Sequence, residues 1–406
     1  MAYAAVRIES LYFPFGTTML STTAFRWNSQ YFFGFFFSYG VYLPFWAIWL
    51  KSQGIAPSDI GLVVGLAFAT RCVANLLFTP RIHRVEQLVP ALRFLSIAGA
   101  LVLALHGVAQ GSMLVISVAT VLFNLCIGPI VPLQDSLTNY YAKLNVLDYG
   151  KTRLWGSIAF IVGSTVVGWC VNFWGEQAIL YTAVLGMLVL FVISLRGLSP
   201  SPEGGNAAAV QRPKLLSVMR EKRTIKFLSL IALIQGSHAA YYSFSSIYWQ
   251  SVGYTEDVIG YLWSIGVVAE IVIFAFSRRL FSSWAIQTMF MVSAVGVIVR
   301  WGLTASTHQI VFVVVIQMLH AVTFAIAHFA AIRYIQAGPA RSMVSLQAMY
   351  NAIPLGAFIA LMTSVSGWGY EIWGVKIFWL MAAMGVAALF IRLDPPNDGE
   401  VEKASA

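Results

Sequence analysis

The chain has 406 residues, of which 59% are hydrophobic and only 10% are charged, and its mean hydropathy is +0.77. Soluble globular chains carry about 25% charged residues, so this composition excludes a soluble domain and indicates an integral membrane protein. The net charge of +9 would suit a nucleic acid, but the basic residues sit where they orient a membrane protein, so we expect no nucleic-acid partner.

Apolar runs between polar breaks predict twelve transmembrane helices, most of them near the roughly 20 residues that cross a bilayer. Barrel strands are excluded because the runs are continuous rather than alternating. In chain order the predicted helices are 29–50, 58–79, 89–109, 112–141, 153–173, 177–196, 225–251, 257–279, 285–305, 309–335, 343–367 and 373–393.

The longest polar interval is rich in Pro, Gly and charge, which predicts a linker between two groups of six helices. The first 28 residues show no cleavage pattern, so we expect no signal peptide, and Met19 is an alternative start to Met1. The predicted divisions are an N-terminal cytoplasmic arm 1–28, a six-helix bundle 29–196, a cytoplasmic linker 197–224, a second six-helix bundle 225–393 and a cytoplasmic tail 394–406.

Lys and Arg are distributed unequally between the two sides of the predicted bundle. Of the 25 basic residues, 21 lie on the side of the termini and the linker, and only Lys51 and Lys376 lie on the other side. Arg71 and Arg300 fall inside helices. Because cytoplasmic loops are enriched in Lys and Arg, we expect both termini in the cytoplasm.

The two halves carry a weak internal repeat. "GIAPSDIGLVVGLAFATR" (54–71) aligns without gaps on "GYTEDVIGYLWSIGVVAE" (253–270), with identities at Gly54, Ile60 and Gly61. Internal repeats of this kind build many transporters, whose substrate site lies at the interface between the repeats. The alignment ends with Arg71 opposite Glu270, so we expect these two charges to face each other across a central cavity.

Glu270 lies in the apolar stretch "VVAEIVIFAF", where an ionised side chain costs about 2.5–3.5 kcal/mol. It therefore needs a partner or a wet cavity, and it is our candidate proton carrier; a permanent structural ion pair is the alternative. Arg71 and Arg300 leave a surplus of positive charge against this single acid. The surplus favours an anionic substrate, unless helix ends neutralise Arg300 or it lies nearer the cytoplasm.

Histidines and aromatic residues supply the remaining candidates. Gln317, His320, Thr323 and Phe324 share one face of the tenth helix, and His320 suits proton coupling because imidazole titrates near neutral pH. His328 is a weaker candidate, and both histidines could instead be packing residues. Some aromatic and polar side chains of the first and seventh helices are expected to line a site, and the others to face lipid. The candidates for the site are Tyr39, Tyr42, His238, Tyr241 and Tyr242.

Asp135 ends the fourth helix and Arg153 opens the fifth, so the two could pair across this hairpin or form a surface salt bridge worth at most about 1 kcal/mol. No catalytic motif and no metal-ligand spacing is present, and Cys72, Cys126 and Cys170 form no disulfide framework. We therefore expect neither an enzyme nor a cofactor.

Several stretches resemble a known family. The six-plus-six arrangement resembles the major facilitator superfamily, and "YGVYLPFWAIWL", "DYGKTRLWGS" and "LHAVTFAIAHFAAIRYI" resemble its lactose permease group. That resemblance implies substrate-binding roles for Arg153 and Asp135 and a coupling role for His320. It also places Arg300, in "VIVRWG", at the position of the group's ninth-helix arginine. The chain departs from the group where Thr323 replaces its proton-carrying acid and where Glu270 lies about one turn from the group's eighth-helix acid.

From residue 28 onward, "FFSYGVYLPFWAIWLK", "HAAYYSFSSIYWQ" and "GYLWSIGVVAEIVIFA" resemble the 3-phenylpropionate transporters. The resemblance implies proton-coupled import of an aromatic acid across a bacterial inner membrane by a monomer. We predict such a transporter, with Arg71 or Arg300 holding the anion and Glu270 the proton. The alternatives are a proton symporter of a neutral sugar or nucleoside and a non-transporting membrane receptor. Substrate, stoichiometry and direction are left open.

Overall fold

The computed structural model describes residues 21–82, 84–203, 218–338 and 340–393. Within these ranges the chain is almost entirely helical, with one short parallel sheet of β1 (Ser21–Thr23) and β2 (Gly197–Ser199). The predicted all-α membrane fold is confirmed. Met1, Met19, most of the predicted linker and the tail 394–406 lie outside the described residues.

Helices of the first half follow the first six predicted segments. The first begins at Ala24, five residues before the predicted start, because Thr23 caps it by accepting a hydrogen bond from the Arg26 N–H. The fourth segment breaks at Gly128 and Pro129. The helices are α1 (Ala24–Ser52), α2 (Pro57–Leu77), α3 (Leu88–Ala104), α4 (Met113–Ile127), α5 (Ile130–Lys143), α6 (Tyr149–Trp174) and α7 (Gln177–Ser194).

Helices of the second half are interrupted more often. The seventh predicted segment breaks after Gly236, and π-helical turns interrupt the tenth at Ala321–Ile326 and the eleventh at Ile353–Phe358. The helices are α9 (Lys222–Gly236), α10 (Ala239–Ser251), α11 (Glu256–Phe281), α12 (Ile286–Ser306), α13 (Ile310–Met318), α14 (Ala327–Gln336), α15 (Ala340–Ala352), α16 (Ile359–Trp373) and α17 (Phe378–Leu389).

Ten helical stretches of the described residues are long and apolar enough to cross a membrane. One of them, Ser342–Leu389, has 48 residues, which is enough for the two crossings predicted there. The stretch formed by α9 and α10 is not among the ten, because polar residues such as Gln235 and His238 interrupt its apolar run. The ten stretches therefore account for eleven of the twelve predicted helices.

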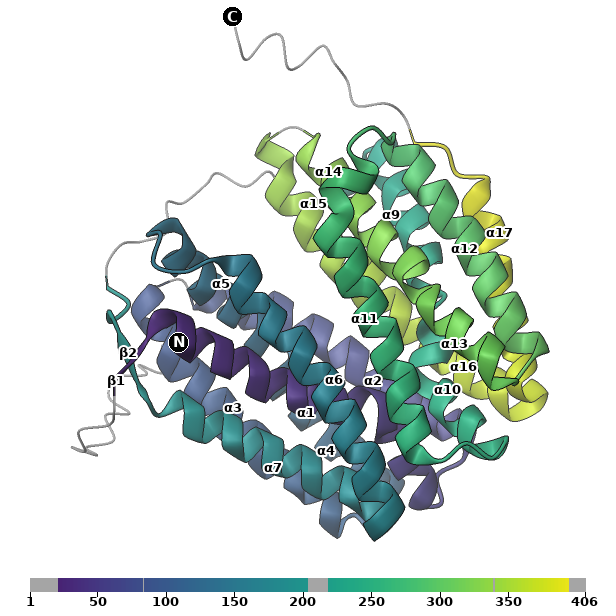
Figure 1. Ribbon diagram of the computed structural model, residues 1–406, viewed down its shortest axis with the longest axis horizontal. Helices are drawn as coiled ribbons and strands as arrows, with labels where there is room; N and C mark the ends of the chain where they lie inside the picture. Colours follow the sequence, from purple (N-terminus) through teal and green to yellow (C-terminus); the bar gives the residue numbers. More distant parts are fainter. Residues whose placement is uncertain (1–20, 83, 204–217, 339, 394–406) are drawn as a thin grey trace, which may run out of the picture.

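The two halves of the chain form two groups of helices that meet along a seam (Figure 1). The purple-to-teal helices of the first half lie apart from the green-to-yellow helices of the second, and the groups meet where α2 packs on α16 and α6 on α11. Glycines allow this contact: a Cβ on Gly61 would lie 2.5 Å from Gly367 Cα, and one on Gly260 would lie 2.3 Å from Ser164 O.

The repeat in the sequence corresponds to a repeat in the structure. Gly54 and Gly253 have positive φ angles of 80° and 93°, in the turns that precede α2 and α11. Side chains with a Cβ rarely adopt this conformation, so glycine is favoured in both turns. Gly61 and Gly260 then lie at matching positions, and both contact the opposite half.

Candidate functional site

The deep carboxylate of Glu270 contacts an imidazole of the tenth predicted helix. Its Oε1 lies 2.7 Å from His320 Nε2, and the side chains of His320 and Glu270 are 9% and 18% exposed. His320 Nδ1 lies 2.8 Å from Arg300 Nη1. Because a guanidinium only donates hydrogen bonds, Nδ1 accepts, and the ring proton lies on Nε2, which donates to the carboxylate. Neutral His320 thus links the buried guanidinium of Arg300 to the buried carboxyl group of Glu270.

Arg300, on α12, is completely buried and has further partners. Its Nε donates to Ile316 O at 3.1 Å, and its Nη1 donates to Thr323 Oγ1 at 3.0 Å. Its guanidinium carbon lies 4.6 Å from the centre of the Tyr241 ring. The Ile316 carbonyl belongs to the last turn of α13, where the helix dipole is negative, so a helix end stabilises this cation in part.

Glu270 and Arg71, which the repeat alignment led us to expect opposite each other across a cavity, have different partners. The described residues contain no ion pair between them; instead Arg71 Nε donates to Asn124 Oδ1 and its Nη1 donates to Tyr39 OH, both at 2.7 Å. Helix packing is the reason, because α2 packs against α16 whereas α11 packs against α6. Equal depth in the repeat therefore does not bring the two charges together.

Arg71 is surrounded by neutral groups. Its guanidinium carbon lies 5.2, 5.8 and 5.0 Å from the ring centres of Tyr39, Tyr42 and Phe68. Among the described residues it forms no ion pair with any carboxylate. A cation within an apolar helix is costly, and the faces of aromatic rings offset only part of that cost. Arg71 is therefore a half-buried positive charge for which the described residues supply no counter-ion.

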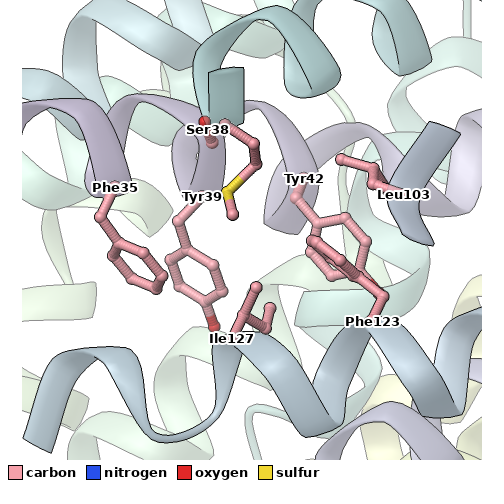
Figure 2. A pocket seen from close by; sticks show the side chains of 8 residues that line it. Phe35, Ser38, Tyr39, Tyr42, Leu103, Phe123 and Ile127 are labelled. Carbon is pink, nitrogen blue, oxygen red and sulfur yellow. The ribbon is translucent and has the colours of Figure 1, made fainter. Parts of the chain in front are cut away.

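Two small pockets lie near this arginine; Arg71 lines the second, and its neighbours Tyr39 and Tyr42 line the first. The first lies between α1, α3, α4 and α7 and has an enclosed volume of only about 10 Å³, and Tyr39 and Tyr42 project into it (Figure 2). The second also has an enclosed volume of about 10 Å³, and it brings Arg71 together with Tyr242 of the second half. Its lining is largely aromatic and apolar: Tyr42, Leu43, Trp46, Ala47, Val64, Phe68, Arg71 and Tyr242.

The predicted residues of the seventh segment have different surroundings. Tyr242 lines the cavity beside Arg71, and its ring centre lies 6.2 Å from that of Phe68. Tyr241 OH donates to Gln317 Oε1 at 2.8 Å. His238 is completely buried, and its Nε2 lies 3.0 Å from Thr323 Oγ1. Tyr241 and His238 thus support the Arg300 cluster and do not line either cavity.

Asp135 and Arg153 form a separate cluster between α5 and α6. Arg153 Nε lies 4.0 Å from Asp135 Oδ1, and each side chain is 31% exposed. Tyr149 OH donates to the same carboxylate oxygen at 3.1 Å. The Arg153 guanidinium carbon also lies 4.2 Å from the centre of the Phe36 ring. The hairpin brings the acid and base together as expected, and Arg153 also interacts electrostatically with Glu270.

One polar residue of the site was missed in the sequence, and two others were recognised without their partners. Asn124, which orients Arg71, is the single amide in the apolar run "VATVLFNLCI", and that isolation was the available signal. Gln317 and Thr323 were recognised as one helix face but not as partners of Tyr241 and Arg300. The described residues contain no group of three His, Cys, Asp or Glu side chains able to hold a metal ion.

The chain is similar to known proteins over most of its length. The MFS_1 like family matches residues 25–381. The chain is 39% identical over 367 residues to an Escherichia coli K12 protein named "Probable 3-phenylpropionic acid transporter", covering 90% of this chain and 97% of that one. It is 23% identical to the maltose permease of Geobacillus stearothermophilus, over 88% of this chain and 92% of the permease.

Solved structures share the fold. The nucleoside transporter NupG superposes with a TM-score of 0.76 at 16% identity, covering 90% of this chain and 97% of its own. The D-xylose-proton symporter superposes with a TM-score of 0.63 at 13% identity, covering 92% and 98%. The fold and the relatives are those of transporters and not of enzymes. The chain therefore belongs to the MFS_1 like family and is a multi-pass membrane transporter of the major facilitator type.

Proposed function

We propose that this protein imports a small aromatic acid together with a proton, by alternating access. The observation that carries the proposal is the hydrogen-bonded chain from Glu270 through His320 to Arg300, which holds one proton-accepting group deep in the membrane. The name of the E. coli relative directs the choice of substrate to 3-phenylpropionate, a carboxylate attached to a phenyl group.

Glu270 receives the proton in this proposal. Ionised, it accepts the His320 Nε2–H and balances the charge of Arg300 through the ring. Protonation removes that negative charge, so the site gains a net positive charge at low dielectric. An anionic substrate then binds more favourably, which couples proton binding to acid binding.

Arg71 holds the substrate carboxylate. It is preferred to Arg300 because Arg300 is fully buried and already has three partners, whereas Arg71 is half-buried and has no counter-ion among the described residues. A guanidinium binds a carboxylate in a bidentate fork, and Tyr42, Phe68 and Tyr242 offer surfaces for a phenyl ring. Because Tyr242 belongs to the second half, the substrate would contact both bundles.

Alternating access follows from the two groups of helices. The bundles 29–196 and 225–393 rock about this site, and the contacts at Gly61 and Gly260 form the closed outer side of the conformation in hand. The excess of Lys and Arg on the side of the termini supports a cytoplasmic location for both of them. We place the protein in the inner membrane of a bacterial cell. We propose that one monomer suffices, because both charged clusters lie within a single chain.

A neutral sugar is the second candidate substrate. The Asp135, Arg153 and Tyr149 cluster favours it, since paired polar groups with aromatic neighbours suit hydroxyl groups, and one relative is named a maltose permease. In the first proposal this cluster instead acts as a gate on the cytoplasmic side. Competition for uptake distinguishes the two: excess maltose lowers uptake only if sugars occupy the site.

The test is uptake of radiolabelled 3-phenylpropionate into proteoliposomes, with and without an inward proton gradient. Wild-type protein is expected to accumulate the acid only with the gradient. Glu270→Gln is expected to lose accumulation but to keep exchange of external for internal acid, because exchange requires no change of protonation. Accumulation by Glu270→Gln equal to wild type contradicts the proton-carrying role. Absence of uptake by folded wild-type protein contradicts the substrate.

A further inference from the structure

Three aromatic rings form a column along the tenth predicted helix. The ring centres of His320 and Phe324 lie 5.3 Å apart at an interplanar angle of 15°, and those of Phe324 and His328 lie 6.1 Å apart at 2°. The column begins at His320, which contacts Glu270, and ends at His328, which the proposed function does not use. Two imidazoles are therefore aligned on one helix face with a phenyl ring between them.

The π-helical turn Ala321–Ile326 produces this alignment. In a regular α-helix of 100° per residue, positions eight apart differ by about 80° around the axis, so His320 and His328 would point in different directions. A π-helical turn closes with i→i+5 hydrogen bonds and holds more residues per turn, so the turn rotates His328 onto the face of His320. Such turns occur frequently at functional sites.

The neighbouring helix α11 faces the whole column. Glu270 and Phe274 are one turn apart on α11; Glu270 contacts His320, and the Phe274 ring lies edge-on to His328 at 6.2 Å and 88°. Glu270 also interacts electrostatically with His328. The carboxylate thus lies opposite both imidazoles, while Phe324 separates them. A phenyl ring carries no exchangeable proton, so any transfer between the two ends depends on Glu270.

His328 lies at the more open end of the column. His320 is buried, whereas His328 is half-buried, and the predicted cytoplasmic loop follows a few residues later. Its Nδ1 lies 2.6 Å from Tyr350 OH on α15. Its Nε2 has no hydrogen-bond partner among the described residues. Tyr350 and Glu270 are the titratable groups that interact with it. In the tautomer whose Nδ1–H donates to Tyr350 OH, Nε2 has the free lone pair that accepts a proton.

We propose that His328 is the proton acceptor that follows Glu270 on the route to the cytoplasm; the inference rests on the proposed function. The Glu270 O–H bond breaks, an N–H bond forms at His328 Nε2, and the regenerated carboxylate returns to His320. The imidazolium then gives one proton to cytoplasmic water. His328 is neutral again, Glu270 is ionised, and the carrier is reset without any other reactant.

The test compares net uptake with exchange in proteoliposomes, using radiolabelled 3-phenylpropionate as the probe. His328→Asn keeps a polar atom near Tyr350 OH but cannot carry the proton. We expect its gradient-driven net uptake to fall about a hundredfold, the usual effect of losing a proton-transfer group, while its exchange stays at the wild-type rate. His106→Asn is the matched control, since His106 is a buried histidine bonded to Leu103 O and Thr120 at a distance from this column.

Tyr350→Phe separates proton transfer from packing. It removes the hydrogen bond to His328 but leaves the imidazole, so coupled uptake should persist. Equal losses in Tyr350→Phe and His328→Asn, or wild-type net uptake in His328→Asn, would overturn the role of His328. If His328→Asn and His328→Gln both lose exchange as well, the residue is structural and the inference fails. Failure of wild type to accumulate the probe would overturn the proposed function and this inference with it.

Discussion

His320 contacts Glu270 through Nε2 at 2.7 Å and Arg300 through Nδ1 at 2.8 Å, so one imidazole ring joins two opposite charges that do not touch each other. Each ring nitrogen has its own partner. A change of proton at either nitrogen therefore alters the contact at the other, which makes the ring a connection between the proton-accepting group and the buried cation.

Replacing His320 by each of two amides tests this connection. Asn places a polar atom near the position of Nδ1 and Gln places one near that of Nε2, so each variant keeps one contact and loses the other. We expect both His320→Asn and His320→Gln to lower the ratio of net uptake to exchange by about tenfold or more. His106→Asn serves as the control. A wild-type ratio in either variant would show that one contact alone is sufficient.

Arg71→Gln tests the proposed carboxylate site. The variant removes a charged donor, and hydrogen bonds to charged groups contribute about 1.5–3 kcal/mol, so the KM for 3-phenylpropionate should rise about ten- to hundredfold. Arg71→Lys should restore little, because an ammonium lacks the bidentate fork. Initial rates of uptake over a range of substrate concentrations provide the measurement.

Arg93→Gln is the matched control for Arg71. Arg93 also lies in an apolar helix, but its Nη2 donates to Ser194 O between α3 and α7, and it lines neither cavity. The KM of Arg93→Gln for 3-phenylpropionate should equal that of the wild-type protein. A normal KM in Arg71→Gln would contradict the site and direct attention to Arg300 or Arg153.

Hydropathy and charge were sufficient to predict the fold. Helix number and the division into halves depend on long apolar runs, whose burial in lipid dominates every local preference. Breaks inside the runs were less predictable. The π-helical turn after His320 depends on packing between helices distant in sequence, and nothing in "HAVTFAI" distinguishes it from a regular helix.

The sequence pointed to the residues of this candidate site but not to the partners that the structure gives them. Arg71, Glu270, Arg300 and His320 were recognised because charged and titratable groups are rare in apolar helices. Their partners depend on the rotation of each helix about its axis, which a repeat alignment does not supply. Each charge therefore has a partner within its own half: Arg71 binds Asn124 in the first half, and Glu270 binds His320 in the second.

Net charge predicts how transport responds to membrane potential. The deep site contains Arg71, Arg300 and Glu270, and binding one proton with one monoanion leaves its charge unchanged. The loaded and empty carriers then cross with equal charge. Accumulation should respond to a pH gradient but not to a potassium diffusion potential imposed with valinomycin. A second proton would move one net charge, and 100 mV would then change accumulation about fiftyfold.

Gly61 tests whether the seam between α2 and α16 is the outer gate. A Cβ there would lie 2.5 Å from Gly367 Cα, so Gly61→Val cannot be accommodated by moving a side chain and must separate two helices of opposite halves. We expect Gly61→Val to disfavour the closed outer side and to lower net uptake about five- to 150-fold, since overpacking costs about 1–3 kcal/mol, while binding of 3-phenylpropionate from outside is retained.

Gly260→Val should act in the same way, because its Cβ would lie 2.3 Å from Ser164 O in the equivalent contact between α11 and α6. Gly107→Ala is the control, since a Cβ there meets Leu180 at an ordinary 3.5 Å. Equilibrium binding and net uptake, measured on the same proteoliposomes, separate gating from unfolding. If both valine variants transport like wild type, the glycine contacts do not have to form in the cycle, and the outer gate must lie elsewhere along the interface.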